Sequence, residues 1–180
     1  MQRFIHRQLG GAVCVAAVCA LIGCSEDSSP SADSTGGVDL ASIRACELLT
    51  PEEIEAATGI GADAGQDIGF AGSVPMCNWP QTGSDFDMVV TLIVTPAAYR
   101  SYEEFRASAR DNAFGDLLAD TDVEAVDVAG ADFGVWMPEA GTLQVYGSGF
   151  MVQVTAETAA GRDEFDASRV LAQAAGARLR

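Results

Sequence analysis

The chain contains no lysine, and its only histidine is His6. Ser-His-Asp and Cys-His mechanisms need a histidine as general base, and histidine-ligated zinc needs it as a ligand. Schiff-base catalysis and phosphate-binding P-loops both need a lysine. These two absences exclude many familiar enzyme sites. They leave carboxylates, tyrosine, hydroxyl groups and arginine as the groups available for chemistry.

Positive charge is also scarce. The 180 residues hold 10 basic residues, all arginine, against 26 acidic ones, which gives a formal net charge of −16. All the acidic residues follow Cys24, whereas Arg3 and Arg7 precede it. Nucleic acid and anionic lipid headgroups would repel such a chain, so we expect no nucleic-acid partner. The charge is typical of a soluble protein held above an anionic membrane. Binding of a cationic ligand or of divalent ions is the alternative.

The N-terminal segment has the pattern of a secretory signal. Arg3 and Arg7 supply positive charge, and residues 9–23 form an apolar core that is too short for a stable membrane-spanning helix. The core ends in Leu21-Ile22-Gly23-Cys24, which looks like a lipobox. At such a site bacteria join diacylglycerol to the cysteine thiol and cleave the chain just before it. An ordinary cleaved signal or an uncleaved anchor is the alternative.

The sequence therefore predicts three parts. These are a lipoprotein signal peptide at 1–23, an acylated Cys24 with a disordered polar tether at 24–39, and a single domain at 40–180. Two or more acyl chains hold a protein stably on a bilayer. We expect the protein to be anchored to the cell membrane through lipid on Cys24, facing outside the cytoplasm.

Two cysteines remain once Cys14 and Cys19 have left with the signal and Cys24 carries lipid. They are Cys46 and Cys77. An exported chain meets oxidising conditions, so we expect the two to form a disulfide. By chain entropy such a bridge contributes roughly 3–4 kcal/mol. A redox-active pair is the alternative, but the spacing is unlike Cys-x-x-Cys.

Hydrophobic periodicity and capping signals predict the elements of an α+β fold. Thr50-Pro51 with Glu53 marks a helix start, Thr95-Pro96 repeats that start, and Asp163 caps a last helix. We expect helices at 51–58, 96–112 and 164–178, and strands at 76–80, 88–95, 123–128, 131–137, 142–146 and 150–156. This order predicts a largely antiparallel sheet of five or six strands with helices packed on it.

Several of these segments resemble a family of small secreted bacterial lipoproteins, best known in actinobacteria, that carry a domain of unknown function. The resemblance lies in Ala45-Cys46-Glu47-Leu48-Leu49-Thr50-Pro51-Glu52-Glu53-Ile54, in Cys77-Asn78-Trp79, and in the stretch at 128–136. It implies a Cys46–Cys77 disulfide and a sandwich of sheet and helices with a PsbP/Mog1-like fold. Ala131 and Phe133 depart from the family pattern. The resemblance brings no activity, no catalytic residue and no cofactor.

The aromatic residues on predicted elements have two interpretations. Trp79 and Trp136 lie on expected strands, and Tyr99, Tyr102 and Phe105 follow helical spacing. A platform for carbohydrate or lipid is conceivable for the tryptophans. Aromatic side chains on strands and amphipathic helices usually pack in the core, which is what we expect for all five.

The sequence contains no recognisable metal-binding or nucleophile motif. The acidic run comprises Asp111, Asp116, Asp120, Asp122 and Glu124. From Asp120 it begins like a calcium loop, but Ala125 and Ala131 stand where an EF-hand needs glycine and a bidentate glutamate. Ser148 lies between two glycines and reads as a hairpin turn, with no histidine to activate it. We expect neither metal nor cofactor and assign no catalytic residue.

The leading hypothesis is a non-enzymatic module of the cell envelope that binds a lipid, a wall component or a protein. A carboxylate-dependent hydrolase is the alternative. A hydrolase needs two carboxylates converging in a pocket with shifted pKa values. A carrier needs an apolar cavity of several hundred Å³.

Overall fold

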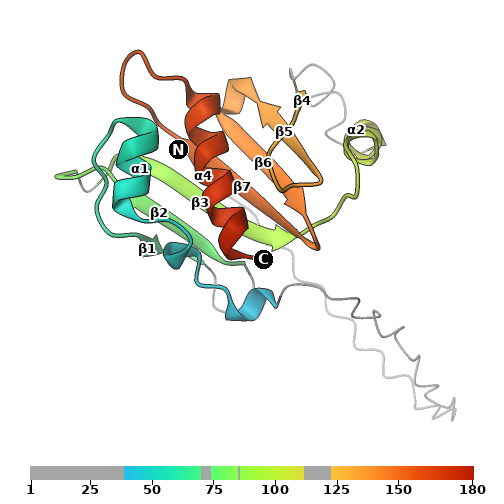
Figure 1. Ribbon diagram of the computed structural model, residues 1–180, viewed down its shortest axis with the longest axis horizontal. Coiled ribbons are helices and arrows are strands. Elements are labelled where there is room, and N and C mark those ends of the chain that lie inside the picture. Colours follow the sequence, from blue (N-terminus) through green and yellow to red (C-terminus); the bar gives the residue numbers. More distant parts are fainter. Residues whose placement is uncertain (1–38, 70–73, 85, 112–122) are drawn as a thin grey trace, which may run out of the picture. The chain divides into compact units, whose positions relative to one another are not determined.

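The structure, a computed structural model, describes residues 39–69, 74–84, 86–111 and 123–180. In this part of the chain seven strands form one sheet in the order β1-β2-β3-β7-β6-β5-β4, and every neighbouring pair is antiparallel (Figure 1). The strands are β1 (Gln66–Asp67), β2 (Met76–Pro80), β3 (Met88–Pro96), β4 (Glu124–Val126), β5 (Phe133–Met137), β6 (Thr142–Gly147) and β7 (Phe150–Ala156).

The helices complete an α+β fold, as expected. They are α1 (Pro51–Thr58), α2 (Tyr102–Asp111) and α4 (Glu164–Arg178), with short 3₁₀ turns η1 (Leu40–Ser42), η2 (Ala45–Glu47) and η3 (Pro138–Ala140). Helix α4 crosses one face of the sheet over β6 and β7, and α1 packs beside α4 on the same face (Figure 1). None of the described helices is long and apolar enough to cross a bilayer.

The core lies between α4 and the central strands β3, β7 and β6. In the register of these strands Leu92 faces Val154, which in turn faces Leu143, and all three are fully buried. Leu171 on α4 is buried in the same cluster. The alternation of β7 produces this arrangement, because Val152 and Val154 point to the helix side while Gln153 and Thr155 do not.

Helix α1 forms as predicted at 51–58, because its ends carry strong signals. The Thr50 hydroxyl accepts from the Glu53 N–H, and the Glu53 carboxylate accepts from the Thr50 N–H, which completes a capping box. Pro51 takes the first helical position, where its missing N–H costs nothing. Gly59 ends the helix at φ +75°, a conformation that glycine adopts without strain.

Helix α4 also matches its predicted bounds. The Asp163 carboxylate accepts from the Asp166 N–H at the start. Leu171, Ala172 and Ala175 are fully buried against the sheet. Arg178 ends the helix, where a cation favours the dipole. This helix brings the last part of the chain against the first part of the fold.

Two expectations were wrong. A helix does not start at Thr95-Pro96, because Pro96 is still the last residue of β3 and pairs with Phe150. The helix begins at Tyr102 instead, where the Ser101 hydroxyl accepts a hydrogen bond from the Glu104 N–H. The expected end of this helix at Asn112 lies outside the described residues. The sheet has seven strands rather than five or six, since the two-residue β1 shows no hydrophobic alternation to predict it.

Candidate functional site

The predicted disulfide is confirmed. Cys46 on η2 and Cys77 on β2 form a bond with their Cα atoms 5.1 Å apart. Gly65 packs directly on it, because a Cβ added there would lie 2.6 Å from the Cys77 sulfur and 2.8 Å from the Trp79 indole nitrogen. The bridge therefore joins η2 to the sheet at a crowded point in the core.

Both tryptophans belong to the core, as expected. Trp79 is fully buried, and its indole N–H has no hydrogen-bond partner among the described residues. Trp136 is buried on β5, and its ring meets that of Phe165 on α4 at a centroid distance of 5.4 Å. These positions favour core packing over an exposed platform for a ligand.

Helix α2 is fixed to the far end of the sheet by aromatic side chains. Phe105 lies within 5.4 Å of Tyr99 and 6.4 Å of Tyr146, measured between ring centroids, and Phe133 stacks on Tyr146 at 4.3 Å. The Tyr102 hydroxyl donates to the carbonyl of Val123. The sequence indicated the three helix-side aromatics but not Tyr146 and Phe133, because β5 and β6 bring these two together from separate strands.

Tyr146 is not poised for acid–base chemistry. Its hydroxyl donates to the Gln144 side-chain oxygen at 2.8 Å, and Gln144 donates in turn to Gln153 at 3.0 Å. Burial raises the pKa of Tyr146 well above its usual value, and the nearby Tyr99 adds to the effect. The phenol therefore stays protonated.

The acidic run and Ser148 form no site in the described part of the chain. Asp116, Asp120 and Asp122 lie outside the described residues, Asp111 ends α2, and Glu124 is exposed on β4. Ser148 lies in the two-residue turn between β6 and β7. Among the described residues no three His, Cys, Asp or Glu side chains come together as a metal site.

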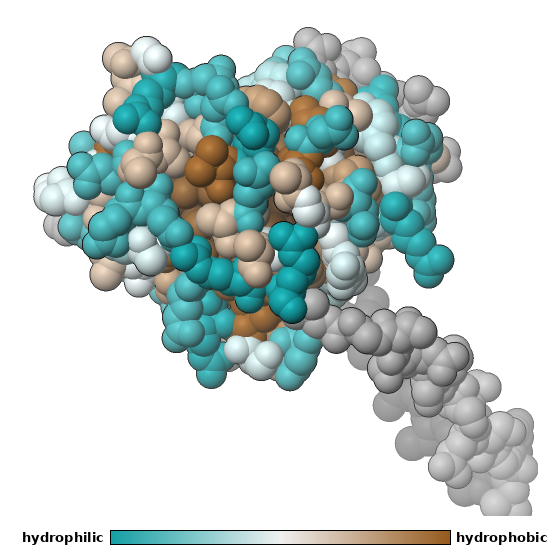
Figure 2. All heavy atoms as spheres, in the orientation of Figure 1, coloured by the Kyte–Doolittle hydropathy of each residue, from teal (hydrophilic) through white to brown (hydrophobic). Residues whose placement is uncertain are grey.

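A hollow of about 500 Å³ runs between α1 and α4 on the described surface. Figure 2 shows apolar surface between these two helices, with hydrophilic surface around it. We call this hollow the α1–α4 groove. Its lining residues are Glu53, Ala56, Ala57, Arg162, Asp163, Asp166, Ala167, Val170, Leu171 and Ala174.

Alanines form both walls of the groove. Ala56 and Ala57 come from α1, and Ala167 and Ala174 come from α4. Leu171 is fully buried, whereas Val170 keeps 47 % of its surface exposed. The groove is therefore apolar and lined by small groups.

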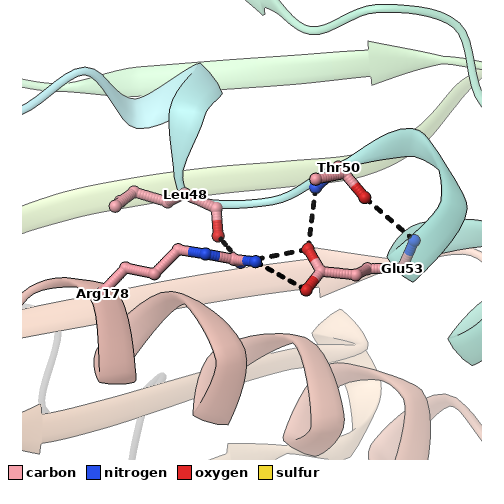
Figure 3. Close-up of polar contacts among 4 residues, drawn as sticks. All are labelled: Leu48, Thr50, Glu53 and Arg178. Atoms are coloured by element: carbon pink, nitrogen blue, oxygen red, sulfur yellow. Dashed lines mark hydrogen bonds and ion pairs between the residues drawn. The ribbon is translucent and has the colours of Figure 1, made fainter.

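An ion pair ties the two helices together at the Glu53 side of the groove (Figure 3). The Arg178 guanidinium donates to both Glu53 carboxylate oxygens, at 2.7 and 3.0 Å, and to the Leu48 carbonyl at 2.6 Å. The same carboxylate accepts from the Thr50 N–H at 2.9 Å. Arg178 thus holds the start of α1 against the last turn of α4.

A second arginine ties the two helices together near the end of α1. The Arg162 guanidinium, just before α4, donates to the carbonyl oxygens of Ala56 and Ala57 at 2.6 and 3.0 Å. These carbonyls lie in the last turn of α1, where they lack partners within the helix. Two arginines therefore fix the position of α1 against α4 along the groove.

The three carboxylates in the groove all have structural partners. Glu53 pairs with Arg178, whose hydrogen bond holds the pKa of that carboxyl below its usual value, although partial burial opposes the effect. Asp163 caps α4. Asp166 accepts from Arg169 at 2.9 Å in an exposed pair.

A smaller hollow of about 350 Å³ lies on the other side of Arg178. It is bordered by Ser42, Ile43, Arg44, Glu47, Leu48 and Leu179 as well as Arg178 itself. Arg178 already donates to Glu53 and Leu48, so its guanidinium is committed to those partners. We regard the α1–α4 groove as the candidate site.

Sequence reasoning missed the groove as a site. It predicted both helices, but nothing in the sequence pairs residue 53 with residue 178. The nearest signal was the alanine-rich, low-charge side of the last helix, with Ala167 and Ala174 seven residues apart. Comparisons of the chain with protein-family models, with curated proteins and with solved structures find no match.

Proposed function

We propose that the protein is a lipid-anchored module of the cell envelope that binds a partner in the α1–α4 groove and catalyses no reaction. The observation that supports binding is the apolar groove of about 500 Å³, whose size is that of ordinary ligand sites. Acyl chains on Cys24 would hold the groove outside the cytoplasm, next to lipids, wall components and envelope proteins.

The state of the groove carboxylates favours binding over a carboxylate-dependent hydrolase. A glycosidase-type mechanism needs one carboxylic acid with a raised pKa beside a free carboxylate. Arg178 instead lowers the pKa of Glu53, and Asp163 is occupied as a helix cap. Hydrolysis at this site would need a protonated carboxylic acid, and the hydrogen bonds from Arg178 favour the ionised form of Glu53.

We also propose that the chain belongs to the secreted lipoprotein family that its sequence resembles, with a PsbP/Mog1-like fold. Two observations support this. The two cysteines of the family pattern are joined in a disulfide, and α1 and α4 form a layer on one face of the antiparallel sheet.

The anchor is tested by changing its thiol. Cys24→Ala should move the protein from the membrane fraction to the soluble fraction and abolish incorporation of labelled palmitate, because the thioether cannot form. Cys19→Ala serves as the control, since it removes a cysteine of the expected signal segment and should leave the label in place. Palmitate incorporation into the Cys24→Ala protein would contradict the assignment of Cys24 as the lipidated residue.

A further inference from the structure

The groove that carries the proposed function also indicates what kind of partner occupies it. Small side chains let a neighbouring helix approach closely, because interaxial distance is set by the side chains at the contact. Ala57 on one wall and Ala167 and Ala174 on the other leave room for such an approach. A helix laid in the groove would rest on both α1 and α4, on the outer side of the helical layer that covers the sheet.

The shorter wall of the groove, α1, is about two helical turns long. Helix α1 has 8 residues, which corresponds to roughly 12 Å. A segment of that length presents apolar side chains at i, i+3, i+4 and i+7 to a groove. Val170, which is 47 % exposed, is the apolar side chain that such a segment would cover.

The charges along the groove select against the other candidate ligands. The lining holds three carboxylates and one guanidinium, and that guanidinium already donates to two α1 carbonyls. Arg178 and Arg169 pair with two of these carboxylates, so it is the net charge of −16 of the whole chain that would repel the headgroup of an anionic lipid. A wall glycan would meet the methyl groups of four alanines over much of the lining, and these offer no hydrogen-bond partner to its hydroxyls.

Asp166 can exchange its ion pair with Arg169 for one with a partner's cation at little cost in free energy. Asp166 pairs with Arg169, but the two side chains are 64 and 35 % exposed. Exposed ion pairs of this kind contribute about 0–1 kcal/mol, so a partner's cation can replace Arg169 without a large loss. The groove therefore suits a ligand with an apolar row flanked by positive charge.

We infer that the occupant of the α1–α4 groove is a cationic amphipathic helix of a partner protein. This inference rests on the proposed function and names its ligand class. Electrostatic attraction to an acidic chain speeds the encounter, while the alanine walls and Val170 supply the apolar contact.

The inference is tested with three synthetic 14-residue peptides. One carries leucine at i, i+3, i+4 and i+7 with lysine elsewhere, the second replaces lysine with glutamate, and the third scrambles the first so that no apolar face forms. Each is titrated into the full, acylated protein in neutral detergent micelles. Methyl NMR signals of Ala57, Val170 and Ala174 report on the groove, and those of Ile68 report on an exposed apolar site elsewhere.

We expect the leucine–lysine helix to shift the groove methyl signals and the other two peptides to bind at least tenfold more weakly.

Val170→Asn should weaken binding of the leucine–lysine peptide by about tenfold, because burial of a valine side chain is lost. Ile68→Asn is the matched control, since it removes an equally exposed apolar side chain and should have no effect. Asp166→Asn should weaken binding several-fold, and Glu139→Gln should not.

Three results would overturn the inference. Equal binding of the leucine–glutamate peptide would leave the groove as a site but remove the cationic partner. Broadening of the groove methyl signals by a spin-labelled fatty acid in the micelles would make the occupant a lipid. Unchanged methyl signals of the groove residues with every probe would reject the groove as a binding site. The membrane anchor is tested separately, by the fractionation of the Cys24→Ala protein.

Discussion

At the scale of single residues, the contact that decides the geometry of the site is Glu53 with Arg178. Glu53 closes the capping box of α1 and accepts two hydrogen bonds from α4, so one carboxylate both starts a helix and fixes its neighbour. The two side chains are 35 and 38 % exposed, which limits the stability that their charges contribute. Their role is to link the start of α1 to the last turn of α4.

Removal of this pair should weaken the fold modestly and in a pH-dependent way. Arg178→Met should lower the free energy of unfolding by about 1–2 kcal/mol at pH 7, since the Leu48 carbonyl and the Glu53 carboxylate lose their donor. The folded-state pKa of Glu53 is lowered from 4.5, so its contribution is present above that value and is lost as the pH falls through the folded pKa.

Denaturant unfolding of both proteins between pH 3 and pH 8 measures this difference. We expect the difference in the free energy of unfolding between the parent and Arg178→Met to be constant above about pH 5 and to become smaller in more acidic solution. Arg169→Met is the matched control, because it breaks the exposed pair with Asp166 within one helix and should change little at any pH. A gap that grows on acidification would contradict the assigned role of Glu53.

Gly65 offers a second test at this scale. Gly65→Ala places a methyl group 2.6 Å from the Cys77 sulfur, where neither the disulfide nor the buried Trp79 ring can move freely. We expect a loss of about 1–3 kcal/mol in thermal or denaturant unfolding. An alanine variant as stable as the parent would show that the contact between Gly65, the bridge and Trp79 is looser than described.

At the scale of elements, α1 and α4 form the groove only because the sheet brings them together. Helix α4 packs over β6 and β7, α1 packs beside α4, and Arg162 and Arg178 then link the two helices. Gly176 lies on the buried side of α4, and a Cβ added there meets no atom within 4 Å.

Gly176→Ala should therefore stabilise the protein by about 0.5–1 kcal/mol, because alanine loses less backbone entropy than glycine in a helix. Thermal unfolding measures the gain. Gly59→Ala serves as the contrasting variant, since φ at that position is +75° and the space beside it is filled by Arg162, so it should destabilise. A destabilised Gly176→Ala protein would mean that α4 lies closer to the sheet than the structure shows.

How far the sequence predicts these elements depends on how local their signals are. The capping box at Thr50 and the cap at Asp163 lie within one turn of the helices they start, and both helices have the predicted bounds. The start of α2 was wrong because Thr95-Pro96 carries the same local signal inside a strand that its partner β7 extends. Strand β1 and the α1–α4 groove depend on pairing between distant segments, which no local pattern encodes.

At the scale of the whole molecule, the proposed function combines a lipid anchor with a binding groove. The disulfide was predictable because two cysteines allow one connectivity, whereas the groove needed residues 53–57 and 162–174 to be brought together in space. A lipid on Cys24 would place that groove in the envelope. The acidic surface would keep the domain off anionic headgroups and draw in cationic partners.

The most direct measurement is photo-crosslinking from inside the groove in the native membrane. The acylated protein is produced in its host with p-benzoylphenylalanine at position 170 or, as a control, at position 68, which is similarly exposed. We predict a discrete adduct with a partner protein from position 170 in the membrane fraction. It should be lost when Ala57→Leu fills the groove, and position 68 should give no such adduct. Equal adducts from both positions, or an adduct that survives Ala57→Leu, would contradict the groove as the binding site.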